Sequence, residues 1–301
     1  MRDPRLHAGY EHASATFTEA ADPVLTVLQG EQFQLDARSL LTGGLFEHTT
    51  EYEKLSIPIT GPVRIEGVRP GDVLRIDVHD ITIADRGAMV TLPGRGGFTG
   101  GLGRSGHVVD IRDGHVHFDE DIMIPIRPMV GKLGVAPAGE TPSSSTVGVH
   151  GGNMDCRDVI AGSTVVLPVQ ADGGLLFAGD LHAVQGDGEC SLTAVEVEGT
   201  VTLSCQVLSG VSLARPAILS EGNVITMGDG DDLDEAARLA LDDMLALVQA
   251  DKGWTREKAA MLLSAAADVA VSQLVNARAS MKVTLPESYF TTPPYSLSIT
   301  N

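Results

Sequence analysis

The chain has 301 residues, of which 43% are hydrophobic and 20% are charged, a composition typical of a globular protein with a sizeable core. Its formal net charge of −19 at pH 7 repels phosphate backbones, so nucleic acid is excluded as an expected partner. No run of about 18 apolar residues is present, so we expect no membrane-spanning helix. Residues Met1–Pro4 also lack the apolar region of a secretory signal.

The first two-thirds of the sequence has the pattern of short β-strands separated by turns. The chain contains 34 Gly and 15 Pro, residues that punctuate such structure. Phe33–Ala37 and Val73–Ile81 alternate apolar with polar side chains, which predicts two half-buried strands. Further strands are expected at Val165–Val169, Leu175–Ala178 and Val195–Leu203.

A glycine-rich stretch from Gly94 to Gly106 shows no periodicity. Residues 101–106 match the GxGxxG pattern of dinucleotide-binding proteins, but the residues that follow, Val108 to Ile111, are typical of a strand rather than a helix. We therefore expect a loop here, with a lid as one role for it.

The C-terminal third has helical spacing. Apolar residues recur every three or four positions from Leu233 to Val248, and Asp232 with Glu235 resembles a capping box at the start of this helix. Thr255 is a good N-cap for a second helix, which the spacing of its apolar residues extends to Leu274, with Asp268 on its solvated side.

Strands followed by helices predict an α+β fold that is mainly β. We expect β-sandwich or barrel-like strands in the first two-thirds and a helical C-terminal part. The chain is interpreted as a single unit, 1–301, divisible into a β-rich part, 1–220, and a helical part, 221–301.

The three cysteines, Cys156, Cys190 and Cys205, are odd in number and have no CxxC spacing. This argues against a disulfide framework and against a cysteine-rich zinc site. A reducing cytoplasm is the expected location.

The segment Gly179–Glu189 concentrates side chains that bind metals. If the preceding strand continues, Asp180 and His182 point to the same face, about 7 Å apart along it. The glycines on either side of Asp187 permit a tight reversal that could bring Glu189 back toward both. A carboxylate–histidine–carboxylate set is the ligand type expected for Zn²⁺ or a similar ion. The alternative is a polar β-hairpin with glycines in its turn.

The segment His150–Cys156 is the second concentration of such residues. Gly151 and Gly152 let the backbone come close to a ligand or to another strand, and Asn153 offers an amide donor for a substrate carbonyl or an oxyanion. Asp155 could be a further metal ligand. The alternative is a loop in which Asn153 and Asp155 satisfy backbone amides.

Other nucleophiles have less support. Ser143–Ser145 could belong to a Ser–Ser–Lys amidase, but no lysine partner is evident, and neither a GxSxG nor an HExxH motif occurs. Cys156 and Cys190 flank the two segments, so a cysteine nucleophile stays open, although such cysteines are more often small buried residues.

The two segments resemble the motifs of the acetamidase/formamidase family. The family pattern reads roughly HGGNMD and GDLHAxQGDGE, and this chain has HGGNMDC at 150–156 and GDLHAVQGDGEC at 179–190. Residues 61–74, 124–137 and 259–275 are also similar to family motifs, so the resemblance covers about residues 22–290.

The resemblance implies hydrolysis of a small aliphatic amide, similar to formamide or acetamide, to a carboxylate and ammonia. It also implies a mainly β architecture with a helical C-terminal part, a homo-oligomer and a divalent metal near the motifs. Zinc is the expected metal and calcium the alternative. Carried over by position, the resemblance nominates a metal and acid/base cluster of Asp155, Asp180, His182 and Glu189. We infer that the first three are metal ligands and that Glu189 is the general base. Asn153 is the expected oxyanion donor, and the further candidates are His150, Gln185, Asp187, Gly151 and Gly152.

Two alternatives stay open. The chain could be a non-catalytic β-rich protein that binds a small molecule, with the same acidic residues holding a structural Ca²⁺. It could also be an amidase that uses Cys156 as its nucleophile.

Overall fold

The structure is a computed structural model that describes residues 6–42, 46 and 56–295. The strands of the described residues join in one hydrogen-bonded network. The β-rich part contains, in chain order, β1 (His7–Ala8), a 3₁₀ turn η2 (Tyr10–His12), β2 (Ala13–Ser14), β3 (Leu25–Val27), β4 (Phe33–Ala37), β5 (Ile59–Ile65), β6 (Val73–Thr91), β7 (Ser105–Arg112), β8 (His115–His117), β9 (Met123–Pro125), β10 (Met129–Val135), β11 (Val147–Gly148), β12 (Gly151–Asn153), β13 (Thr164–Pro168), β14 (Leu176–His182), β15 (Glu196–Leu208) and β16 (Ala217–Ser220). The C-terminal part contains β17 (Asn223–Gly230), α2 (Leu233–Lys252), α3 (Arg256–Ala266), β18 (Asp268–Gln273), β19 (Ala279–Pro286) and a 3₁₀ turn η5 (Glu287–Tyr289).

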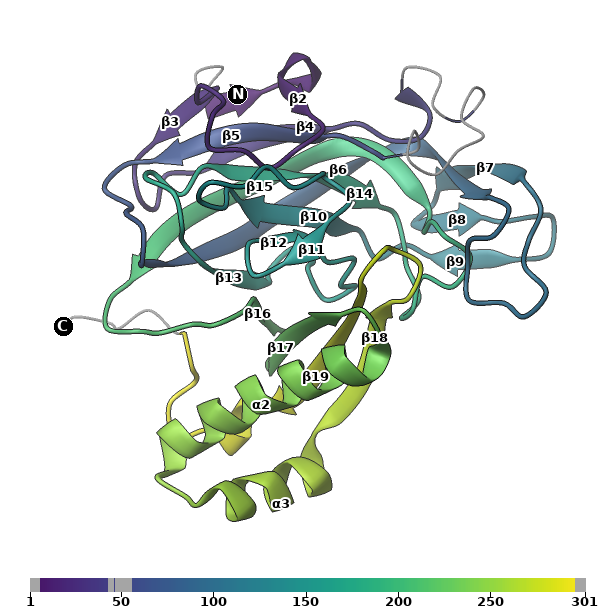
Figure 1. Ribbon diagram of the computed structural model, residues 1–301. Coiled ribbons are helices and arrows are strands. Elements are labelled where there is room, and N and C mark those ends of the chain that lie inside the picture. Colours follow the sequence, from purple (N-terminus) through teal and green to yellow (C-terminus); the bar gives the residue numbers. More distant parts are fainter. Residues whose placement is uncertain (1–5, 43–45, 47–55, 296–301) are drawn as a thin grey trace.

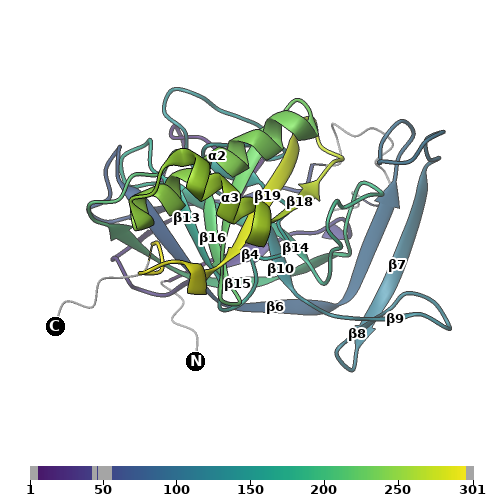
Figure 2. The same cartoon turned by 90° about the horizontal axis from the view of Figure 1, so that it is seen from below.

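The fold is mainly β with helices near the C-terminus, as the sequence predicts. The long strand β6 pairs with β15 along most of its length, and its two ends add β13 and β7. The strands curl around one another above α2 and α3, and β7, β8 and β9 extend to one side (Figure 1). Figure 2 shows the two helices lying across the strands of the C-terminal part.

The predicted strands are confirmed, and their apolar faces form the main core. Phe33, Leu35 and Ala37 are buried while Gln34 and Asp36 are partly exposed, the alternation of a strand with one buried face and one partly solvated face. On β6, Leu74, Ile76 and Val78 are buried in the same core cluster. The strands predicted near 165, 175 and 195 correspond to β13, β14 and β15.

The first predicted helix is confirmed as α2. The Asp232 side chain accepts a hydrogen bond from Glu235 N, and Gly253 ends the helix in the left-handed conformation with φ of 63°. The buried face of α2 packs with strands β17 and β19 through residues that include Ala240, Met244 and Val283.

The second predicted helix is wrong in its length. Helix α3 ends at Ala266, and residues 268–273 form β18, which pairs with β19. Val269 and Val271 are β-branched and favour a strand, and Ala267 has already left the helical region at φ −97° and ψ 141°. Asp268 therefore begins a strand and does not lie on a helix.

The glycine-rich stretch 94–106 forms a loop that leads into β7, so the GxGxxG match has no helix to open. The loop packs against the segment that follows Glu189, because Gly97 N donates to Cys190 O at 2.9 Å. Within the described residues no helix is long and apolar enough to cross a membrane. Met1–Pro4, from which no secretory signal was expected, lies outside the described residues.

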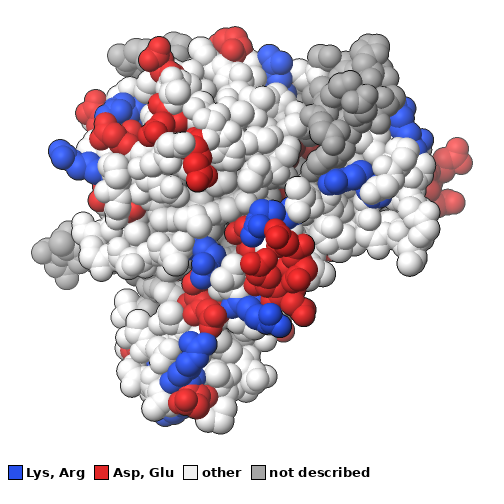
Figure 3. Space-filling view, in the orientation of Figure 1, with Lys and Arg blue, Asp and Glu red and all other residues white. Residues whose placement is uncertain are grey.

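Charged side chains of both signs lie next to one another where the helices meet the β-rich part (Figure 3). Arg278, for example, pairs with Asp229 at 2.7 Å and with Asp231 at 2.6 Å.

Candidate active site

The register of the sheet brings the two predicted segments together. Strand β10 lies between β12 and β14, so that Lys132 is opposite Asn153 on one side and Gly179 on the other. Strand β14 then pairs with β15, which places His182 opposite Glu196. Lys132, Asn153 and Glu196, which are far apart in the sequence, therefore line one cavity, whereas His182 is fully buried and does not line it.

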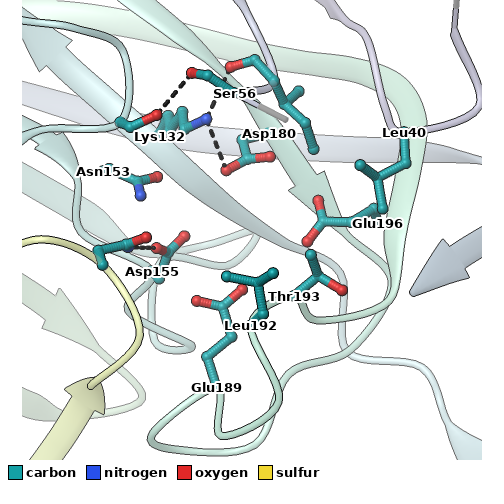
Figure 4. Close-up of a pocket in the computed structure, with 13 residues that line it drawn as sticks. Leu40, Ser56, Lys132, Asn153, Asp155, Asp180, Glu189, Leu192, Thr193 and Glu196 are labelled. Carbon is teal, nitrogen blue, oxygen red and sulfur yellow. Dashed lines mark hydrogen bonds and ion pairs between the residues drawn. The ribbon is translucent and has the colours of Figure 1, made fainter. Parts of the chain in front are cut away.

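The cavity has a volume of about 40 Å³. Its polar lining includes Lys132, Asn153, Asp155, Asp180, Glu189 and Glu196 (Figure 4). Leu40, Ile57 and Leu192 form its apolar wall. A cavity of this size suits a molecule of a few heavy atoms.

The carboxylates and His182 form two overlapping clusters. One ligand atom from each of Asp155, Asp180 and His182 lies within 4.8 Å of the other two, and the same is true of His182, Glu189 and Glu196. The predicted convergence of Asp180, His182 and Glu189 is thus observed. Glu196 is an additional member of the second cluster. It lies between Val195 and Val197 on a predicted strand, and its side chain lines the cavity.

Three of the acidic residues adopt backbone conformations that non-glycine residues rarely adopt. Asp155, Asp180 and Glu189 have φ of 42°, 58° and 47°. Such conformations cost about 1–3 kcal/mol each and persist only where the surrounding structure enforces them. They concentrate at functional sites, and here they direct three carboxylates to one point.

Burial gives this cluster strongly shifted acidities. Desolvation, with the nearby Asp180 carboxylate, raises the pKa of Asp155 to about 6. Desolvation raises the pKa of Glu196 to about 8 and that of Glu189 well above its usual value. Burial opposes the charged form of His182, but the facing carboxylates of Glu196, Asp180 and Glu189 outweigh it and raise its pKa well above the usual value. Four carboxylates thus face one lysine and one histidine, a set that favours an added cation.

The donor set fits a divalent metal. Asp155 Oδ1, Asp180 Oδ1 and His182 Nε2 are all buried without a hydrogen-bond partner in the described structure, so each retains a free coordinating atom. Gly131 leaves room beside them, because a Cβ on it would lie 2.8 Å from Asp155 Oδ1 and 3.0 Å from His182 Cε1. Glu189 Oε1, in contrast, already accepts a hydrogen bond from Ala194 N at 3.0 Å. The first cluster is therefore the better candidate for the metal.

Several other predicted residues lie around the cluster. Gln185 bonds His182 Nδ1 at 2.9 Å, and Asp187 pairs with Lys282 at 2.6 Å. His150 does not line the cavity; its ring packs edge-on against Phe17 at 4.9 Å between centroids. Burial lowers the pKa of His150 to about 4, which is typical of a neutral core histidine.

Gly151 and Gly152 allow two strands to approach closely. Their φ values are 85° and 89°, and a Cβ would lie 2.4 Å from Leu133 O at the first and 2.2 Å from Thr146 O at the second. Neither glycine lines the cavity. Of the two roles considered from sequence, close contact with another strand is the one observed.

The structure brings a lysine near the serines that was not evident from the sequence. Ser56 and Ser145 line the same cavity as Lys132 and bond each other at 2.7 Å. However, the Lys132 ammonium donates to Ile57 O at 2.8 Å and pairs with Asp180 Oδ2 at 3.3 Å. These contacts direct its Nζ to Ile57 and Asp180 and not to a serine hydroxyl. A single lysine within the otherwise uncharged strand Met129–Val135 was the available sequence signal.

Comparisons with known proteins agree with the family resemblance. The Acetamidase/Formamidase family model matches residues 143–292, which contain both motifs. A predicted acetamidase/formamidase from Thermoanaerobacter tengcongensis and an acetamidase from Bacillus halodurans are each 32% identical with a TM-score of 0.88, over 94% of this chain and 97% and 98% of theirs. The chain belongs to the acetamidase/formamidase family.

Curated relatives of the family are longer than this chain. An acetamidase from Mycolicibacterium smegmatis is 24% identical over 62% of this chain and 63% of its own length. The chain thus spans less than two thirds of the length of the curated relatives it matches.

The three cysteines lie outside the lining of the cavity. All three are free; Cys156 and Cys205 are buried, Cys190 is exposed, and none lines the cavity. Burial raises the pKa of the Cys156 thiol to about 12, so it is not ionised near neutral pH.

Proposed function

We propose that this chain hydrolyses a small aliphatic amide, similar to formamide or acetamide, to a carboxylate and ammonia. The observation that carries the proposal is the cavity of about 40 Å³ lined by buried carboxylates, in a fold shared with acetamidases. The reaction adds water across the carbon–nitrogen bond. It requires a base for the water, a proton for the leaving nitrogen and donors for the carbonyl oxygen.

Asp155, Asp180 and His182 would hold a divalent cation, which we propose to be zinc. When bound there, such a cation supplies Lewis-acid chemistry that lowers the pKa of water and polarises a carbonyl. Zinc is favoured over calcium because His182 stands within the acidic cluster, and imidazole suits zinc while calcium takes oxygen ligands.

Glu189 is the proposed general base. Its carboxylate lies in the cavity within the second cluster, next to His182 and Glu196. It accepts the proton of the attacking water and transfers it to the nitrogen that leaves as ammonia. The hydrogen bond that Ala194 N donates to Glu189 Oε1 orients the carboxylate.

Lys132 and Asn153 are the proposed donors to the carbonyl oxygen. Both line the cavity from adjacent strands, and Lys132 Nζ lies 3.3 Å from Asp180 Oδ2. An ammonium and an amide can each donate to an oxygen that gains negative charge. The backbone amides of Gly151 and Gly152 are less suited, because these residues do not line the cavity.

The test is ammonia release from formamide, acetamide and larger amides, before and after removal of metal by a chelator. We expect turnover of the smallest amides, loss of turnover without metal and recovery when zinc is added back. No ammonia from any linear amide would overturn the proposed function. Full turnover by metal-free protein would overturn the metal's role.

Two variants separate the proposed base from a proposed ligand. Glu189→Gln keeps its metal and loses about 10²–10⁴-fold in rate, because the amide has the shape of the acid without its basicity. Asp155→Asn loses metal affinity. If Glu189→Gln were metal-free while Asp155→Asn were metal-loaded but inactive, Asp155 would be the base and Glu189 the ligand.

We also propose a homo-oligomer in the cytoplasm. Three unpaired cysteines suit a reducing compartment. Sedimentation analysis of the purified protein tests the assembly.

A further inference from the structure

Gln185 is a buried side chain whose amide can be oriented in only one way. Its Nε2 donates to Asp155 O at 2.6 Å and approaches Ser272 O at 3.5 Å. Both partners are backbone carbonyl oxygens, which only accept hydrogen bonds. If the amide were rotated by half a turn, its own oxygen would face these two oxygens and lose both bonds. Oε1 of Gln185 is therefore the atom that faces His182.

This orientation decides which nitrogen of His182 carries a proton. Gln185 Oε1 lies 2.9 Å from His182 Nδ1, and an amide oxygen can only accept, so Nδ1 must be the donor. The other nitrogen, Nε2, faces Glu196 Oε2 at 3.2 Å and Asp180 Oδ2 at 3.9 Å. The proton on Nδ1 is required whether or not Nε2 is protonated.

We propose that Gln185 is a positioning residue that fixes the Nδ1–H form of His182, so that the lone pair of Nε2 is presented to a cation held with Asp155 and Asp180. The inference rests on the proposed function and specifies how the same site is assembled. Gln185 touches neither the substrate nor the cation in this scheme. It acts through the imidazole on one side and the Asp155 backbone on the other.

The C-terminal part supports this arrangement from behind. Ser272 Oγ has one proton and lies within hydrogen-bond distance of two carbonyl oxygens, Met154 O at 3.2 Å and Asp155 O at 3.1 Å, so β18 contacts the carbonyl that orients Gln185. The loop after Gln185 is fixed to the same strand, because Gly188 N donates to Ser272 O at 3.0 Å. Asp155, Gln185 and His182 are thus linked through one buried set of hydrogen bonds.

The experiment compares Gln185→Leu and Gln185→Glu with the wild-type chain. Gln249→Leu is the matched control, because this glutamine on α2 also donates to a backbone carbonyl, Trp254 O at 3.4 Å, far from the cluster in sequence. Zinc affinity is measured by equilibrium competition with a chelator. The protonation of each His182 nitrogen is read from NMR spectra of protein with ¹⁵N-labelled histidine, assigned with a His182→Asn variant.

We expect Gln185→Leu to weaken zinc binding about 10–100-fold, as is typical when the partner of a ligating histidine is lost. The slowly exchanging Nδ1 proton of wild-type His182 should disappear or exchange rapidly. Gln185→Glu keeps an acceptor for Nδ1–H, so this proton should persist. Its second carboxyl oxygen replaces Nε2 opposite Asp155 O and Ser272 O and loses both bonds, so only part of the affinity should return. Gln249→Leu should match the wild type in both measurements.

Three results would overturn the proposal. These are an unprotonated Nδ1 in the wild type, unchanged zinc affinity with a retained Nδ1 proton in Gln185→Leu, or an equal loss of affinity in Gln249→Leu. If the wild type binds no zinc, the metal part of the proposed function fails, and the NMR spectra of metal-free protein still decide whether Gln185 fixes the proton on Nδ1. Thermal unfolding of each variant identifies a loss that comes from misfolding.

Discussion

Lys132 and Lys282 are both buried lysines on strands, but they differ in the number of carboxylates that face each ammonium group. Lys132 is 3% exposed and Lys282 is 5% exposed. Lys282 lies between two carboxylates, Asp158 Oδ2 at 2.7 Å and Asp187 Oδ1 at 2.6 Å. Lys132 has one carboxylate, Asp180, and one carbonyl oxygen, Ile57 O.

The difference separates a structural cation from one available to a ligand. Lys282 links β19 to the loops that carry Asp158 and Asp187, and its charge is more than balanced by them. Lys132 borders a cavity with one of its three N–H groups left for a substrate oxygen in our scheme. Burial alone is thus a poor guide to function, and the number of counter-charges is a better one.

The largest expected effect is on turnover, from Lys132→Met. Losing one preorganised donor to a developing oxyanion costs about 10²–10³-fold in rate, or about 3–4 kcal/mol. We expect this loss in kcat/KM for acetamide, measured by ammonia release. Lys282→Met, assayed well below its unfolding temperature, should lose less than about tenfold. Similar losses in the two variants would remove the distinction between the lysines.

Lys282→Met should have the larger effect on stability. Removing one partner of a buried ion pair leaves uncompensated charge and costs about 3–5 kcal/mol. We expect about 3 kcal/mol, the lower end, because the Asp187 side chain is 37% exposed. Urea unfolding measures the change. Arg256→Met, which breaks an exposed ion pair with Asp242, is the control and should change stability by less than about 1 kcal/mol.

His150 extends the comparison to a buried group with no counter-charge. Its folded-state pKa is lowered to about 4 from an ordinary 6.5, so the native state binds fewer protons than the unfolded chain in acid. Stability is therefore lost as the pH falls from about 6.5 to about 4, by up to about 3 kcal/mol in total. His150→Leu removes this contribution, and its stability should depend less on pH than that of the wild type over this range. The measurement is the urea midpoint of both chains at pH 7 and at pH 5. An equal change of midpoint between the two pH values in both chains would contradict the prediction.

Local signals predicted the elements whose conformation is decided locally. The alternation in Phe33–Ala37 and the caps of α2 at Asp232 and Gly253 were sufficient, because side-chain period and end-capping fix these elements. Residues 268–273 were predicted as helix because Ala and Leu kept a helical spacing beyond α3. Val269 and Val271 are a weak local signal for a strand, and pairing with β19 decides the segment.

The site shows the same division. Asp155, Asp180, His182 and Glu189 lie in two short motifs and were named from them. Lys132 and Glu196 were missed because only the register of β10, β14 and β15 brings them to the cavity. His150 was named as an extra ligand because no local pattern indicates that its ring packs against Phe17.

The smallest expected effect is that of Cys156→Ser, and it tests the cysteine mechanism. Lys282, Asp158 and Asp187 form a group of ion pairs, here called the Lys282 cluster. Cys156 lies beside it, with Sγ 3.6 Å from Asp158 Oδ2, and is fully buried outside the lining of the cavity. A thiol with its pKa raised to about 12 is ionised in only about one molecule in 10⁴–10⁵ near neutral pH, so it is a poor nucleophile. We expect kcat/KM within about twofold of the wild type and a stability loss of about 1 kcal/mol, because the smaller, more polar hydroxyl packs less well. Cys190→Ser, at an exposed thiol, should change neither quantity. If Cys156→Ser alone were inactive while Glu189→Gln retained turnover, the hydrolysis would proceed through a thioester on Cys156. That result would contradict both the proposed attack by water and the assignment of the Lys282 cluster as purely structural.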